Sequence, residues 1–191
     1  MKIRKLCLTF LMTACIVSAE ETLLKSGELK SGGFGGPVVK ISQVNGEAGV
    51  LVGGRGGWLI NSVFSIGGGG YGLVNDIHAD HPDSMRIDLG VGGLILEAVF
   101  MPQRLVHGTA SVLVGAGGLN RHRRMRDDSD DGGETFFALE PEVNLEINVH
   151  RIFRVCSGLS YRWLAGESDF VDSDWDLSGI SVNLTFKFGR F

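Results

Sequence analysis

The charged side chains that could form a common site lie in segments where polar and apolar residues alternate. The stretch 140–149 reads E-P-E-V-N-L-E-I-N-V, with a glutamate or an asparagine at every second position. Side chains two residues apart in a strand point to the same face. Cations take alternate positions in the segments that follow, so carboxylates and cations of neighbouring strands could pair on one face. The candidate residues of this charge network are Arg55, Glu97, Glu140, Glu142, Glu146, Arg154, Arg162 and Lys187.

A second group of charges lies in the polar segment 120–133, which reads N-R-H-R-R-M-R-D-D-S-D-D-G-G. Guanidinium groups bind phosphate through paired hydrogen bonds, so these arginines could contact lipopolysaccharide if the segment lies just outside a bilayer. In the simpler alternative, which we favour, the basic and acidic halves of a solvated loop pair with each other. The candidate lipopolysaccharide contacts are Arg121, Arg123, Arg124 and Arg126.

Other kinds of site are weakly supported. The aspartates of 127–131 and 172–176 resemble parts of a calcium loop, but the position of the closing glutamate holds Ala138 in the first and Asn183 in the second. The aspartates beside His78 and His81 could add oxygen ligands for a transition metal. Glycine-rich stretches such as G-G-R-G-G-W lack the following helix of a phosphate loop. We therefore expect neither a metal nor a cofactor.

A catalytic pair is also weakly supported. His107 and Ser111 share a strand face, but four residues along a strand separate them by about 13 Å, too far for direct proton transfer. We expect no catalytic residue and no enzyme. A formal charge of −4 over 191 residues likewise gives no basic face for nucleic acid.

The elements that must position the charged residues are strands. From about residue 36 onward, roughly eight strand-like segments of about 10–15 residues alternate with short turns or longer polar segments, and none has a helical period. Strands of about 9–11 residues are long enough to cross a bilayer. Tight turns alternate with longer loops, which is the asymmetry of an outer-membrane barrel. The sequence predicts an all-β, antiparallel, up-and-down transmembrane barrel with short periplasmic turns and longer external loops.

The N-terminus is typical of an exported protein. Residues 1–19 have a charged start, an apolar run and a V-S-A end, as in a signal peptide. An alternative is that M-T-A-C is a lipobox and that Cys15 is lipidated. We interpret residues 20–31 as a short periplasmic tether and residues 32–191 as the barrel domain. Cleavage after Ala19 would leave Cys156 as the remaining cysteine.

The aromatic residues favour a membrane barrel over a soluble one. Alternation alone does not decide, because either kind of barrel has one apolar face. Apolar rows carry Phe153 and Phe186 near one rim and Tyr161 and Trp163 near the other, as aromatic girdles do. The polar rows combine small residues with charges of both signs, as a narrow interior requires. Mixed charges would close the lumen rather than form a pore.

Together, the export signal, the long amphipathic strands and the final phenylalanine resemble the small outer-membrane β-barrel proteins of Gram-negative bacteria, of the OmpA/OmpX type. The resemblance implies a bacterial outer-membrane location, contact with membrane lipid, recognition by the barrel-assembly machinery and a monomer with a structural or surface-interaction role. In that family a C-terminal aromatic in phase with the lipid-facing row is the assembly signal. Here Phe188 is in phase and Phe191 is terminal, so either a bulge at Gly189 or use of Phe188 is expected.

Two other functions remain as alternatives. The first is a secreted, soluble, lipocalin-like barrel that binds an apolar ligand. The second, less favoured, is a lipid A-modifying barrel enzyme, a class in which His and Ser act near the external rim.

Overall fold

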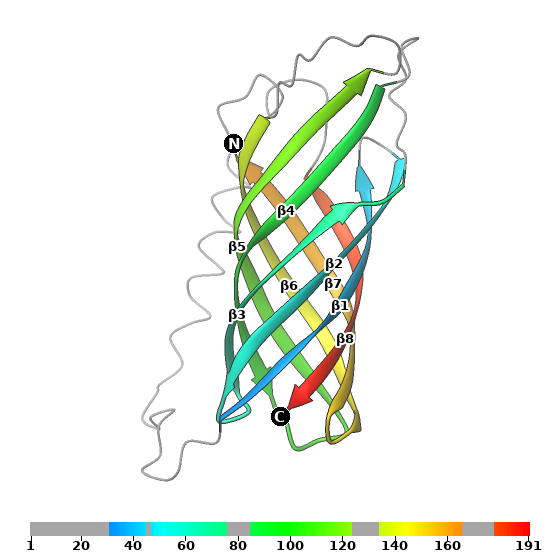
Figure 1. Ribbon diagram of the computed structural model, residues 1–191. Helices are drawn as coiled ribbons and strands as arrows, with labels where there is room; N and C mark the ends of the chain where they lie inside the picture. Colours follow the sequence, from blue (N-terminus) through cyan, green and yellow to red (C-terminus); the bar gives the residue numbers. More distant parts are fainter. Residues whose placement is uncertain (1–30, 45–46, 76–84, 124–133, 166–177) are drawn as a thin grey trace, which may run out of the picture.

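The chain forms a closed antiparallel barrel in which each strand pairs with its neighbours in the sequence and the first strand pairs with the last (Figure 1). The computed structural model describes residues 31–44, 47–75, 85–123, 134–165 and 178–191. Within these residues the strands are β1 (Ser31–Val44), β2 (Glu47–Ile60), β3 (Phe64–Leu73), β4 (Met85–Phe100), β5 (Val106–Arg123), β6 (Glu134–His150), β7 (Phe153–Ala165) and β8 (Gly179–Arg190). The predicted fold class is confirmed.

Three tight turns lie at one end of the barrel, which we call the short-turn end. They join β2 to β3, β4 to β5 and β6 to β7. In the first turn Asn61 and Ser62 both have positive φ angles, of 52° and 61°, as a type I′ hairpin turn requires. Met101, with φ 55°, begins the second. The C-terminal end of β8 lies at this same end of the molecule (Figure 1).

Two boundaries differ from the sequence prediction. Because proline disfavours the middle of a strand, the sequence predicts that Pro141 marks the outer end of one. In the structure β6 begins at Glu134, and Pro141 lies within it opposite Val112. Pairing of β6 with β7 is interrupted at positions 140 and 141, because proline has no N–H to donate to the ladder. The strand β5 also extends to Arg123, which pairs with Met85, so the connection after β5 begins later than predicted.

The outer surface of the barrel is apolar. Side chains that point outward include Val143, Leu145 and Ile180, which are 60%, 64% and 65% exposed. Aromatic residues lie toward both ends of this surface, with Trp58 and Phe100 at the short-turn end and Tyr161, Trp163 and Phe137 at the opposite end. None of the described residues belongs to a helix long and apolar enough to span a membrane.

The interior has two parts. Near the end opposite the short turns, buried apolar side chains pack together, among them Leu51, Leu89, Leu119, Phe136 and Leu164. Toward the short-turn end most of the buried side chains are polar or charged, although Leu59 and Val99 are buried there too. Ser42, Arg162 and Ser181 are buried polar residues at the opposite end. The sequence predicts charged rows in the interior but does not single out the apolar cluster, because β2 to β5 carry aliphatic residues on both faces.

Candidate functional site

The polar part of the interior is built around four glutamates that point inward from β4 and β6. Glu142 accepts hydrogen bonds from Arg55 Nη1 at 2.7 Å, from Lys40 Nζ at 2.9 Å and from Asn144 Nδ2 at 2.8 Å. The other guanidinium nitrogen of Arg55, Nη2, lies 2.9 Å from Glu97 Oε2. One arginine therefore links carboxylates of two strands.

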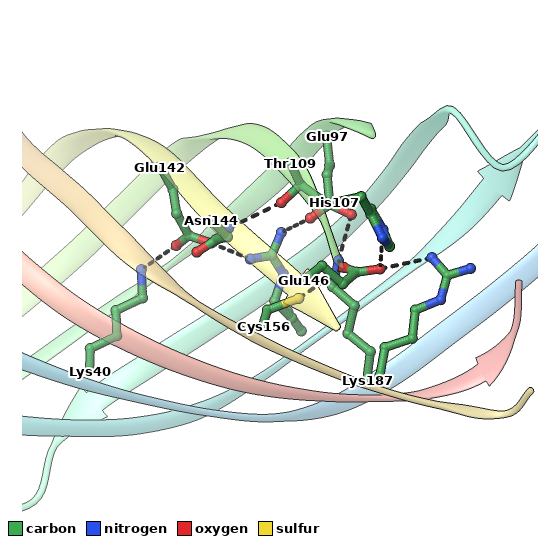
Figure 2. A network of polar contacts seen from close by, with 11 residues as sticks. Lys40, Glu97, His107, Thr109, Glu142, Asn144, Glu146, Cys156 and Lys187 are labelled. Carbon is green, nitrogen blue, oxygen red and sulfur yellow. Dashed lines mark hydrogen bonds and ion pairs between the residues drawn. The ribbon is translucent and has the colours of Figure 1, made fainter. Parts of the chain in front are cut away.

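Glu146 lies at the centre of the cluster nearest the short-turn end (Figure 2). Its Oε2 accepts from Lys187 Nζ at 2.7 Å and from the Cys156 thiol at 2.8 Å. Its Oε1 lies 2.8 Å from Arg154 Nη1 and 3.2 Å from His107 Nε2. Four side chains from three strands thus meet one carboxylate that is 1% exposed.

Glu140 forms the cluster nearest the apolar part of the interior. It accepts hydrogen bonds from Lys40 Nζ and from the Tyr71 hydroxyl. Lys40 Nζ also lies 4.9 Å from the centre of the Tyr71 ring, which is within cation–π distance. Tyr71 thereby joins the charged side chains to the apolar cluster of which its ring is a member.

Several of these contacts cross the barrel rather than follow its wall. Lys187 on β8 lies 2.7 Å from Glu97 on β4, and Arg55 on β2 lies 2.7 Å from Glu142 on β6. Each pair joins strands that are separated by three others in both directions around the barrel. The side chains therefore meet across the full width of the interior.

All eight residues predicted for the charge network are buried, and seven of them have the ion pairs described above. The eighth, Arg162, is completely buried and donates to Ser42 Oγ at 3.3 Å, among other contacts. The described part of the interior holds five lysine and arginine side chains and four glutamates.

Sequence reasoning missed four members of this interior: Lys40, Tyr71, His107 and Cys156. Lys40 lies two residues from Val38 and from Ser42, so strand periodicity alone places it on their face, and all three are buried. The pairing of His107 with Glu146 depends on the register between β5 and β6, in which the two residues are opposite each other. Register between distant segments was the information that the sequence pattern lacked.

His107, considered above as half of a catalytic pair, has structural contacts on both ring nitrogens. Nδ1 lies 3.2 Å from the carbonyl oxygen of Arg104, and Nε2 contacts Glu146. Ser111 lies further along β5, opposite Glu97 and Glu142, and lines a small internal cavity of about 20 Å³ with Tyr71 and others. A cavity of this size has room for about one water molecule.

The two phenylalanines considered as an assembly signal point to different faces. Phe188 is in the outward row of β8 and is 52% exposed. Phe191 follows the end of β8, and its ring stacks on Phe34 at a centroid distance of 6.2 Å. The register of β8 against β1 is continuous from Gly189 to Arg190, so β8 does not bulge at Gly189.

Several other predicted sites fall outside the described residues. Arg124 and Arg126 lie there, as do both aspartate segments and the histidines at 78 and 81. Arg121 and Arg123 belong to the end of β5, but their side chains are not described. Among the described residues, no cluster of three or more histidine, cysteine or acidic side chains is arranged to bind a metal ion.

Comparison with known proteins identifies the fold. No protein-family model matches the sequence, and no curated protein matches it. Solved structures do match. Neisserial surface protein A (NspA) aligns over 86% of this chain and 99% of its own, with a TM-score of 0.59 and 10% identity. The N-terminal barrel of Pseudomonas aeruginosa OprF aligns over 85% and 99%, with a TM-score of 0.55 and 12% identity.

The attachment invasion locus protein Ail of Yersinia pestis also matches, over 85% of this chain and 99% of its own, with a TM-score of 0.50 and 14% identity. A second structure of Ail contains the heparin analogue sucrose octasulfate. At these identities the likeness concerns the fold alone. The chain therefore has the fold of the small eight-stranded outer-membrane β-barrels, as the sequence resemblance implied.

Proposed function

We propose that this chain is an integral, monomeric β-barrel of the bacterial outer membrane, with a closed interior and a structural or surface-interaction role at its external end. The observation that carries the proposal is the distribution of polarity. Glu97 and Glu146, which point into the barrel, are 1% exposed, whereas the apolar side chain of Leu145 is 64% exposed on the outer wall. Such a surface is stable in lipid and unfavourable in water.

The same observation argues against the soluble lipocalin-like alternative. A soluble barrel that binds an apolar ligand needs an apolar interior and a polar exterior. Here the charged side chains of Arg55, Glu142 and Lys187 fill the interior instead. Burying such groups inside a water-soluble barrel, while leaving an apolar belt in water, would cost free energy on both faces.

A closed interior is supported by the ion pairs that cross it. Eight-stranded barrels are narrow enough for side chains to fill them. Lys187 with Glu97, and Arg55 with Glu142, occupy the width of the barrel at two levels, and the apolar cluster around Leu89 and Phe136 fills a third. We propose that these layers together prevent the passage of solutes.

A surface role is supported by the length of the strands at the end opposite the short turns. β5 has 18 residues. At about 3.4 Å per residue and a tilt of about 40°, a strand of that length rises about 45 Å, against an apolar belt of about 25 Å. The β4–β5 pair would therefore stand above the bilayer. Two proteins with the same fold are named for the cell surface or for attachment, Neisserial surface protein A and the attachment invasion locus protein Ail, which favours a surface role here as well.

Two partners are part of this proposal. Arg121, Arg123, Arg124 and Arg126 would contact lipopolysaccharide phosphates at the external end, where bidentate guanidinium–phosphate pairing is available. Phe188 is the residue that we propose the barrel-assembly machinery reads, because it points outward at the end of β8. Phe191, which stacks on Phe34, is less suited to that role.

Fractionation tests the proposal. We expect the full chain, expressed in a Gram-negative host, to remain with outer membranes after alkaline washing and to be extracted only by detergent. We also expect detergent-folded protein to migrate differently on gels before and after boiling, as closed barrels do. Recovery of the folded protein in the soluble fraction without detergent would overturn the membrane assignment.

A further inference from the structure

A cleft of about 730 Å³ opens at the short-turn end of the barrel, between the β6–β7 turn and the C-terminal end of β8. Its lining carries cationic and hydrogen-bonding groups from Asn148, His150, Arg151, Arg154 and Arg190. Ile152 and Phe191 complete it. The cleft adjoins the internal charge network at Arg154, which belongs to both.

Arg151, Arg154 and Arg190 give the cleft an excess of positive charge, which the α-carboxylate of Phe191, the last residue, offsets only in part. Arg154 forms an ion pair with Glu146, with 2.8 Å between Nη1 and Oε1. Its guanidinium carbon lies 3.9 Å from the centre of the Phe191 ring. Arg151 and Arg190 are both exposed, and neither forms an ion pair with any described residue. No acidic side chain lines the cleft. Its charge therefore matches an anionic group.

The position of Arg190 indicates where that anion comes from. The outward row of β8 reads Val182, Leu184, Phe186 and Phe188, and Arg190 is the next member of the row. An arginine at the edge of an apolar belt extends its charged end to the level of the lipid headgroups. Arg190 thus belongs both to the cleft and to the membrane-facing surface.

Apolar and aromatic side chains continue from the cleft along the outer wall. Ile152 is 60% exposed, and Phe153 stacks on Phe188 at a centroid distance of 4.8 Å and on Phe186 at 6.3 Å. This surface could lie along acyl chains while the arginines hold a phosphate. A free anion would use the arginines but would gain nothing from the aromatic surface.

We infer that this cleft binds the headgroup of an anionic phospholipid in the periplasmic leaflet, with Arg151 and Arg190 pairing with its phosphodiester and Ile152 and Phe188 contacting its acyl chains. The inference rests on the proposed membrane location and orientation. Guanidinium groups can hold two phosphate oxygens at once, which favours phosphate over a single point contact.

The test uses the folded full-length barrel in a neutral detergent and measures bound lipid by native mass spectrometry. The probes are dioleoylphosphatidylglycerol, dioleoylphosphatidylcholine and inorganic phosphate. We expect binding of the anionic lipid to be about tenfold tighter than that of the zwitterionic lipid, a difference of about 1.4 kcal/mol. In the R151Q/R190Q variant we expect the two lipids to bind about equally. The matched control is R104Q, which removes an exposed arginine from a different short turn.

The outcomes separate the two proposals. A barrel that folds, shown by its heat-dependent gel migration, but has no preference for the anionic lipid contradicts the inference and leaves the membrane assignment intact. A preference that survives in R151Q/R190Q, or is lost equally in R104Q, also overturns it. Inorganic phosphate that competes fully with the lipid would show a general anion site instead. A chain that does not fold in detergent or vesicles contradicts the proposed function itself.

Discussion

Lys187 and Glu97 meet at 2.7 Å although β8 and β4 stand on opposite sides of the barrel. The ammonium group also reaches Glu146 at 2.7 Å, so one lysine joins two carboxylates of different strands. Buried ion pairs repay the cost of desolvation only when their remaining hydrogen-bonding groups are satisfied as well. The contacts of Glu146 with Arg154 and Cys156 meet that condition here.

Removing the carboxylate of Glu146 should destabilise the barrel strongly. E146A leaves the cations of Lys187 and Arg154 buried without their shared partner, and breaking a buried pair in this way costs about 3–5 kcal/mol. Urea unfolding of the barrel in lipid vesicles measures the effect. Glu167→Gln, at a position outside the described residues, removes one negative charge and serves as the control. An unchanged free energy of unfolding in E146A would show that the cluster does not hold the strands together.

Cys156 reports whether the interior is closed. Its side chain is 1% exposed, and its thiol donates to Glu146. In the folded mature barrel we expect a water-soluble maleimide to leave Cys156 unlabelled, and to label it fully after denaturation. Rapid labelling of the folded protein would mean that the interior is open to solutes. The R55A variant removes an ion pair that crosses the barrel and should accelerate labelling.

Two glycines offer a matched comparison of inner and outer positions. A Cβ atom added at Gly69 would lie 2.9 Å from the carbonyl oxygen of Gly54 and 2.9 Å from both Arg55 Cβ and Ile95 Cδ1, whereas one added at Gly90 meets nothing within 4 Å. Overpacking of this kind costs about 1–3 kcal/mol. We expect G69A to lower the free energy of unfolding by that amount.

The G90A control should leave the free energy of unfolding unchanged or raise it by about 0.4–1 kcal/mol, because alanine restricts the unfolded chain. Equal effects of the two substitutions would contradict the interior packing described for β3.

The loss of stability caused by an arginine substitution on the outer wall should depend on how deep the residue lies in the bilayer. Val143 is 60% exposed near the middle of β6, and V143R should destabilise the inserted barrel by about 2–4 kcal/mol. Ile152, in the turn at the rim, is also 60% exposed, yet I152R should cost about 0–1 kcal/mol. Unfolding titrations in vesicles compare the two. Equal tolerance of arginine at both sites would mean that β6 does not face lipid at position 143.

The sequence predicted the barrel because alternation, turn chemistry and loop lengths are local signals. Asn61 and Ser62 adopt a tight hairpin turn of the kind that the short connections predict, and the glutamates of β6 share one face, as their period indicates. What could not be predicted depends on contacts between distant segments. The partners of Lys40 are about 100 residues away, and the pairing of His107 with Glu146 follows from register.

At Pro141 a local signal in the sequence gives a wrong prediction. Because proline is a reliable signal against central strands, the sequence predicts a strand end at this position. The strand tolerates it because pairing with β7 is interrupted there while pairing with β5 continues through Val112. Similarly, aliphatic residues on both faces of β4 concealed which of them form the internal apolar cluster.

Quenching of tryptophan fluorescence by brominated phospholipids tests the central claim most directly, because it reports contact between the outer wall and lipid. Trp58 and Trp163 are 54% and 46% exposed on that wall, toward opposite ends of the barrel. W175F removes the third tryptophan, which lies outside the described residues. In vesicles of brominated lipid, we expect both remaining tryptophans of the folded barrel to be quenched. A folded barrel whose tryptophans are not quenched by the lipid but are quenched by an aqueous quencher would contradict the assignment of the apolar wall to the membrane.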